Sequence, residues 1–138
     1  LVGCTSVPPT PTSSTVVPPV SASPWAGPPS PIREEVARDL WSSGARTTTP
    51  GEADLGNEQW VASGRCDGGG DLAVTYTVTV DGTFESGGTI VCSMGVTYTN
   101  SAIQPRKGKH RVEVMFGPEV VNTNWAYIRI IPTRLVDP

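Results

Sequence analysis

The stretch that decides the fold runs from Cys66 to Cys92 and reads CDGGGDLAVTYTVTVDGTFESGGTIVC. Over residues 72–80, apolar side chains alternate with Ala or Thr, which is typical of a strand with one buried face. Asp81-Gly82 predicts a tight turn, after which a second apolar run ends at Cys92. The two cysteines lie 26 positions apart, each at the end of a strand-like segment, and predict a disulfide across a small β-sandwich. In the chain-entropy account, such a bridge stabilises a fold by roughly 3 kcal/mol.

The same period of two appears on both sides of this stretch. Alternating segments rich in Thr, Val, Ile and Tyr occupy residues 60–66, 96–100, 110–116 and 124–131, and Gly or Pro turns separate them. The sequence therefore predicts a mainly β fold, either an antiparallel β-sandwich or a jelly roll. In the last segment, the side chains expected to face the core are Ala126, Ile128 and Ile130.

One short N-terminal helix is predicted in the segment IREEVARDLWSSG, which follows Ser30-Pro31 and ends at Gly44. Ser30 is suited to capping it, Pro31 to its first position and Gly44 to its end. Apolar residues recur every four positions and would form one stripe: Ile32, Val36 and Leu40. Residues 45–58 show no period and are expected to form a loop.

Charge divides the chain into two parts. The 138 residues include 10 Lys or Arg and 13 Asp or Glu, and all of these charged residues lie from Arg33 onward. We therefore expect a tether over residues 1–31 and one β-sandwich domain over residues 32–138, enough chain for a single core. A net charge of −3 gives no reason to expect nucleic acid as a partner.

The tether sequence is dominated by proline and hydroxyl residues. Residues 5–31 contain nine prolines, six serines and four threonines, so neither helix nor sheet can propagate through them. An extended spacer of this length spans at most about 80 Å. Trp25 is the one aromatic residue in this segment. It is either a docking anchor on the domain or an exposed aromatic residue, and the sequence alone favours the second interpretation.

Leu1-Val2-Gly3-Cys4 resembles the lipobox of bacterial lipoproteins. In that family, the signal peptide is removed just before the cysteine, whose sulfur carries a diacylglycerol. The resemblance implies lipidation of Cys4, with palmitate-type acyl chains in the membrane, and explains why a third cysteine stands outside the predicted disulfide. It places the domain at the extracytoplasmic face of the bacterial cell membrane.

A second, looser resemblance covers about half of the chain. The pattern from Cys66 to Val74, the strand ending at Cys92 and the segment from Gly108 to Val114 are similar to small β-sandwich lipoproteins of high-GC Gram-positive bacteria. The resemblance implies the same fold and location. Those proteins are mostly uncharacterised, so it transfers no catalytic residue.

Residues that carry chemistry are sparse. His110 is the only histidine, and no nucleophile-elbow pattern accompanies it, so we expect no catalytic residue. One histidine and two bridged cysteines cannot supply a zinc site. Asp67 and Asp71 flank a Gly-Gly-Gly turn that could hold calcium, although a tight turn is the favoured interpretation. We therefore expect no metal and no cofactor.

The candidate binding residues are Trp125, Tyr127 and Arg129, which alternate with the core residues of the last segment. Exposed aromatic residues on a sheet can stack on sugar rings or form a protein contact. The favoured alternative is that the helix over 32–41 covers them. The basic cluster in residues 106–111 could contact anionic polymer, but charged hairpin tips are common on solvated surfaces.

Taken together, the residues predict a membrane-anchored extracytoplasmic lipoprotein that presents a non-catalytic β-sandwich for binding or for envelope structure. Its partners would be the membrane, through Cys4, and cell-wall polymer or another surface protein. The alternative is a carbohydrate-binding module or an accessory domain of a secreted cell-wall enzyme. These alternatives differ in whether aromatic side chains stand open on a sheet face.

Overall fold

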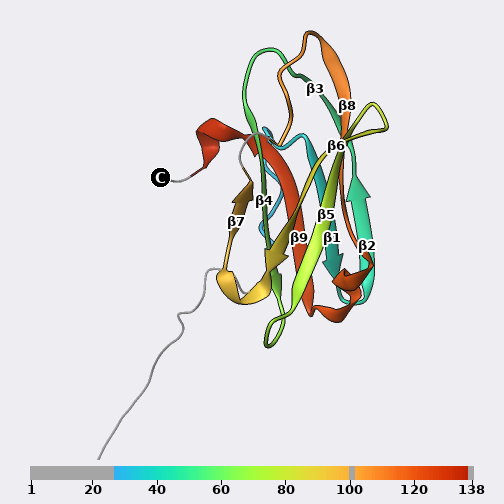
Figure 1. Ribbon diagram of the computed structural model, residues 1–138, viewed down its shortest axis with the longest axis vertical. Helices are drawn as coiled ribbons and strands as arrows, with labels where there is room; N and C mark the ends of the chain where they lie inside the picture. Colours follow the sequence, from blue (N-terminus) through green and yellow to red (C-terminus); the bar gives the residue numbers. More distant parts are fainter. Residues whose placement is uncertain (1–26, 100–101, 137–138) are drawn as a thin grey trace, which may run out of the picture.

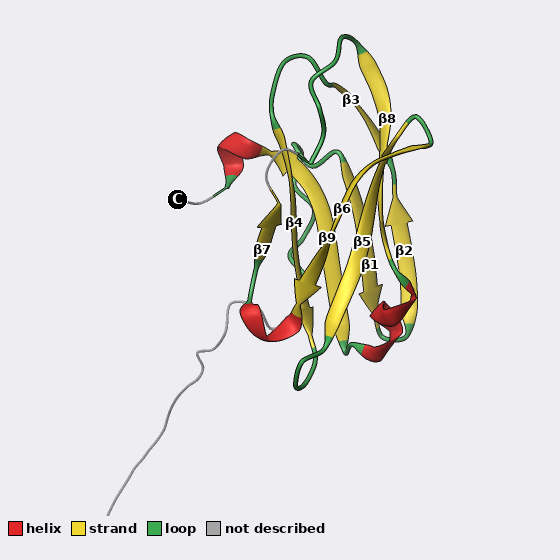
Figure 2. Cartoon of the chain, in the orientation of Figure 1, coloured by secondary structure: helices red, strands yellow, loops and turns green. Residues whose placement is uncertain are grey.

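The computed structural model describes residues 27–99 and 102–136 as two antiparallel sheets that face each other (Figure 1). The first sheet has the strand order β2-β1-β9-β4-β7, and the second has the order β3-β8-β5-β6. Strands account for most of this part of the chain, with only short 3-10 turns as helix (Figure 2). The bounds are β1 Ala37–Ser42, β2 Ala45–Thr49, β3 Gly51–Asp54, β4 Trp60–Asp67, β5 Ala73–Val80, β6 Thr83–Val91, η1 Cys92–Met94, β7 Thr97–Thr99, β8 Lys109–Phe116, η2 Pro118–Asn122, β9 Trp125–Pro132 and η3 Thr133–Leu135. The predicted mainly β, sandwich-like fold is confirmed.

The core lies between the sheets, where the period-two patterns placed it. The inward side chains of β5, β8 and β9 are fully or almost fully buried: Val74, Tyr76, Val78, Val80, Val112, Val114, Phe116, Ala126, Ile128 and Ile130. The hairpin between β5 and β6 turns at Asp81 and Gly82, both with positive φ, as expected for a two-residue turn. Alternation was a reliable guide to the inward face because each strand has one face on the core.

The predicted N-terminal helix is wrong, because β1 occupies Ala37–Ser42 in its place. β1 pairs with β2 on one side and β9 on the other, and these ladders satisfy its backbone along its whole length. The four-residue spacing of Ile32, Val36 and Leu40 was therefore coincidental; Ile32 is 38% exposed. Ser43 and Gly44, assigned to the helix end, form the β1–β2 turn with positive φ at both positions.

The predicted loop over residues 45–58 is replaced in part by two strands. β2 ends at Thr49 and β3 begins at Gly51, so Pro50 alone carries the chain from one sheet to the other. Both are edge strands with mostly exposed side chains. Only four or five residues lie in each, which is why no hydrophobic period marked them.

The predicted disulfide joins Cys66 to Cys92, with their Cα atoms 4.7 Å apart. Cys66 lies in β4 of the first sheet, and Cys92 follows β6 of the second. Both cysteines are buried. The bridge therefore links the two sheets covalently at one end of the sandwich.

At the inner face of β1, the fully buried carboxylate of Asp39 links three strands. It accepts hydrogen bonds from Arg46 Nη2 at 2.7 Å, Arg46 Nε at 3.0 Å, Phe116 N at 2.8 Å, Thr48 Oγ1 at 2.9 Å and Leu40 N at 3.1 Å. Arg46 and Thr48 belong to β2, whereas Phe116 ends β8 of the opposite sheet. Burying a charge is tolerable only when it is paired and hydrogen-bonded in this way.

We expect the Asp39→Asn variant to be less stable than the parent by roughly 3 kcal/mol, because breaking a buried charge pair leaves donors unsatisfied. An asparagine offers one carbonyl oxygen where the carboxylate offered two, and its amide group would face the donors of Arg46 or Phe116. Urea unfolding measures this as a lower midpoint with an unchanged slope.

The matched control is Glu52→Gln on β3, where the side chain is exposed and the same charge is removed. Its effect should stay within about 0.5 kcal/mol. Equal losses in the two variants would show that the buried network has no special role.

Candidate binding faces

The outer face of the five-stranded sheet carries the predicted binding residues, and we call the group Leu40, Arg65, Trp125, Tyr127 and Arg129 the aromatic face. The rings of Trp125 and Tyr127 stack with their centroids 6.4 Å apart and their planes 16° apart. Arg65 lies 6.0 Å from the Trp125 ring, and Arg129 lies 5.9 Å from the Tyr127 ring. The structure thus brings the three predicted residues together and adds Arg65. The two guanidinium groups lie at distances from the rings that suit cation–π contact.

An irregular segment before β1 covers one end of the aromatic face. Glu35 pairs with Arg38 at 2.9 Å and lies 3.7 Å from Arg129, while Arg38 Nη1 donates to the carbonyl of Pro29 at 2.8 Å. Arg38 and Arg129 are register partners on the outer side of β1 and β9. Residues near the predicted helix therefore do cover part of this face, but as turns and ion pairs.

Tyr127 is fully buried although it points to the outer side of β9. Burial raises the pKa of its hydroxyl above the ordinary value of 10.0, and the nearby Arg129 opposes that rise. Trp125 and Arg129 are half-buried. In this arrangement Tyr127 is not open to a ligand, and the binding role of the three residues stays a prediction.

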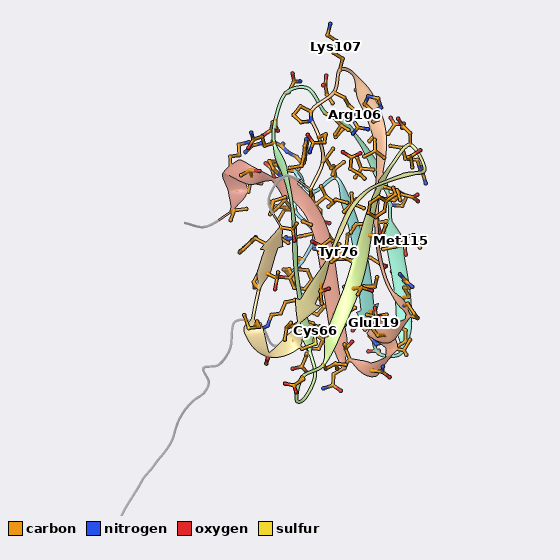
Figure 3. The ribbon with its side chains drawn as sticks, in the orientation of Figure 1. Cys66, Tyr76, Arg106, Lys107, Met115 and Glu119 are labelled. Carbon is orange, nitrogen blue, oxygen red and sulfur yellow. A yellow bond between two sulfur atoms is a disulfide. The ribbon has the colours of Figure 1, made fainter. Side chains whose placement is uncertain are left out.

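The outer face of the four-stranded sheet presents a different surface, which we call the threonine face: Thr75, Thr77, Thr79, Phe84, Gly87, Thr89 and Met115. These residues belong to β5, β6 and β8 and lie side by side in the ladders, with Met115 opposite Thr77 and Thr77 opposite Gly87. Most of their side chains are exposed. Figure 3 labels Met115 on this side of the molecule.

Two large apolar side chains stand in the open on the threonine face. Phe84 is 67% exposed and Met115 is 43% exposed. A methyl group added at Gly87 would lie 3.8 Å from Cε1 of Phe84 and 2.8 Å from the carbonyl oxygen of Tyr76. The Phe84 ring therefore lies beside the bare backbone of Gly87, which creates a shallow apolar platform among hydroxyl groups.

Glu119 limits the threonine face at one end. Its Oε1 accepts hydrogen bonds from Thr75 N at 3.0 Å and Thr75 Oγ1 at 2.7 Å. The Thr75 hydroxyl, and then its backbone N–H, lower the pKa of the Glu119 carboxyl. Glu119 therefore remains charged and is held beside the threonine rows (Figure 3). The sequence had not indicated it as a residue of a binding surface.

The predicted basic cluster lies at the opposite end of the molecule, and much of its charge is paired. Arg106 Nη2 lies 2.7 Å from Glu85, and Arg111 lies 3.4 Å from Glu113. Lys107 extends from the tip (Figure 3). An anionic polymer would require a continuous patch of exposed positive charge. These ion pairs neutralise part of the charge of the cluster.

His110 at the same tip contacts a carboxylate and a backbone carbonyl. Its Nδ1 lies 2.6 Å from Asp81 Oδ2, and its Nε2 lies 2.7 Å from the carbonyl oxygen of Lys107. Asp81 Oδ1 also accepts from Arg111 N at 2.9 Å. The histidine therefore links the β5–β6 turn to the start of β8 through hydrogen bonds.

Within residues 27–99 and 102–136, no group of three or more His, Cys, Asp or Glu could hold a metal ion, and Asp67 Oδ2 instead accepts a hydrogen bond from Asn124 Nδ2 at 2.9 Å. The same part of the chain encloses no pocket and has no helix long and apolar enough to span a bilayer. Cys4 lies outside the described residues.

No family model, curated protein or solved structure matches this chain.

Only part of the threonine face could be predicted from the sequence. Alternation placed Thr75, Thr77 and Thr79 outward, but threonine is also a favoured strand residue on any solvated face. Phe84 and Met115 come from different strands, and nothing in their sequence positions indicates that they flank the same rows. Only the ladder register of β5 with β6 and β8 brings them together.

The Asp81–His110 pair predicts a defined pH dependence. The Asp81 hydrogen bond raises the pKa of His110 above 6.5, with a smaller opposing effect from Arg106, and the His110 hydrogen bond lowers the pKa of Asp81 below 3.8. The His110 contribution to stability is full below pH 6.5 and is lost as pH rises through its folded pKa. The Asp81 contribution is present above pH 3.8 and is lost as pH falls through its folded pKa.

An NMR titration of the imidazole measures the effect without ambiguity, because the chain has one histidine. The parent should titrate above pH 6.5, and the Asp81→Asn variant should titrate closer to that ordinary value. Identical titration curves would rule out the pairing in solution.

Proposed function

We propose that this chain is a lipid-anchored, extracytoplasmic display module that binds cell-wall polysaccharide through the threonine face. In this role the chain performs no chemistry. Cys4 carries the lipid, residues 5–31 form the stalk, and the sandwich is the part that meets the ligand. The observation that carries the proposal is the exposure of Phe84 and Met115 on the two strands that flank the β5 threonines.

The composition of the threonine face suits a hydroxyl-rich polymer. Threonine hydroxyls both donate and accept hydrogen bonds, and their methyl groups add apolar contact. Outward side chains repeat at about 6.8 Å along a strand and about 4.8 Å between strands, so the rows present a regular, extended surface. The Phe84 ring offers the flat apolar partner that a sugar ring requires.

The position of the stalk supports the same assignment. The described chain begins at Gly27, and Pro29 contacts Arg38 on the outer side of the first sheet. The threonine face lies on the second sheet, on the opposite side of the sandwich. The described residues therefore enter the domain on the side opposite the threonine face.

The lipid anchor predicts a specific intact mass. Protein extracted from its native membrane should begin at Cys4 and carry a diacylglyceryl group, because a lipobox cysteine is modified before cleavage. Mass spectrometry of the intact chain, with and without lipase treatment, measures this directly. An unmodified Cys4 in membrane-extracted protein would contradict the anchor and leave the polysaccharide assignment to be judged separately.

The binding assignment predicts a loss of retention on insoluble cell-wall polysaccharide. The Phe84→Ala/Met115→Ala double variant should bind roughly tenfold more weakly than the parent, because it loses the exposed aromatic platform and its apolar neighbour. Co-sedimentation at several protein concentrations gives the two dissociation constants. Far-ultraviolet circular dichroism checks that both proteins are folded.

Tyr98→Ala is the matched control, because Tyr98 is 42% exposed but lies on β7 of the other sheet. It should bind like the parent. Absence of parent binding to the polysaccharide would overturn the assignment. So would binding that survives glycan digestion but is lost on protease treatment of the wall, since that result would identify a protein partner.

A further inference from the structure

We propose that the proline-rich segment over residues 5–26 docks on the aromatic face of its own domain, with Trp25 as the anchor. The occupant is thus a segment of this chain, and the site is the surface around Trp125 and Tyr127. This inference goes beyond the display function, because it concerns the opposite sheet and the stalk itself. Three observations carry it.

The first observation is where the described chain begins. Gly27, Pro28 and Pro29 are each half-buried, and the Pro29 carbonyl is held by Arg38 at 2.8 Å. The segment directly upstream therefore starts in contact with the domain, at the Arg38–Arg129 pair that borders the aromatic face.

The second observation is that the distances fit. Trp25 lies four positions before Pro29, and an extended chain of that length spans at most about 14 Å. Tyr127 lies two residues from Arg129 along β9, which is about 7 Å, and Trp125 lies at about twice that distance. Trp25 can therefore reach the Tyr127 and Trp125 rings without any rearrangement of the domain.

The third observation is the match in chemistry. Proline-rich chains are bound by aromatic-lined surfaces, because a polyproline helix loses little entropy on binding. The aromatic face offers the Trp125–Tyr127 stack with Arg65 and Arg129 beside the rings. The segment carries no charge, so it meets these arginines without repulsion.

The burial of Tyr127 supports this assignment. An outward side chain of a central strand is shielded when other residues lie over it, and the described ion pairs of Glu35 cover the neighbouring Arg38 and Arg129. Extending that cover by one step along β9 places the upstream segment over Tyr127. The stalk would then be shorter than its extended length.

Hydroxyl-radical footprinting of the full chain tests the proposal. In Trp25→Ala, oxidation of Trp125 and Tyr127 should rise roughly fivefold, because losing one aromatic contact shifts the docking equilibrium toward the open state. Trp60 is only 6% exposed in the core and should not change, which reports that the fold is intact. Val20→Ala in the same segment is the matched control and should behave like the parent.

Unchanged oxidation of Trp125 and Tyr127 in Trp25→Ala would overturn the proposal. Protection that grows with protein concentration would also overturn it, because the occupant would then be a second copy. The same variant should keep its retention on polysaccharide, so this experiment and the threonine-face experiment can fail independently. Trp25→Tyr should restore most of the protection if an aromatic anchor is what docks.

Discussion

The buried carboxylate of Asp39 is the interaction on which the rest of the structure depends. It lies on the inner side of β1, yet its partners come from β2 and from the end of β8 in the opposite sheet. Arg46 extends the link by donating to the Phe116 carbonyl. A charge without water must be surrounded by donors, so the relative positions of these strands are tightly constrained. Two strands across the first sheet, toward the same end of the sandwich, the Cys66–Cys92 bridge joins the sheets covalently.

Because the Asp39 network and the disulfide link the inner faces of the two sheets, the two outer faces are free to differ. One face carries stacked rings, arginines and a segment that enters from the stalk, whereas the other carries threonine rows around an exposed phenylalanine. The difference in side-chain character implies a division of labour. In our proposals, the first face contacts the chain's own stalk and the second binds an external ligand.

Much of the fold could be predicted from local patterns, because β5 and β8 each bury one face and therefore alternate strictly. The disulfide followed from cysteine spacing. β1 was misassigned because Ile32, Val36 and Leu40 imitate a helical period, and the pairing with β9 that overrides it is not local. Asp39 could not be found for the same reason: its donors lie up to 77 positions away. The threonine face likewise depends on ladder register, which residue order does not reveal.

The order of attachment along the chain has a mechanical consequence. If the proposed stalk carries load, tension on it reaches β1 before any other strand, and β1 lies inside its sheet with hydrogen-bonded neighbours on both sides. Sliding β1 along its length would require both ladders and the Asp39 network to break together. A domain tethered through an edge strand would have only one ladder to break. Under the proposed tether, the sandwich is therefore suspended from a strand that resists load.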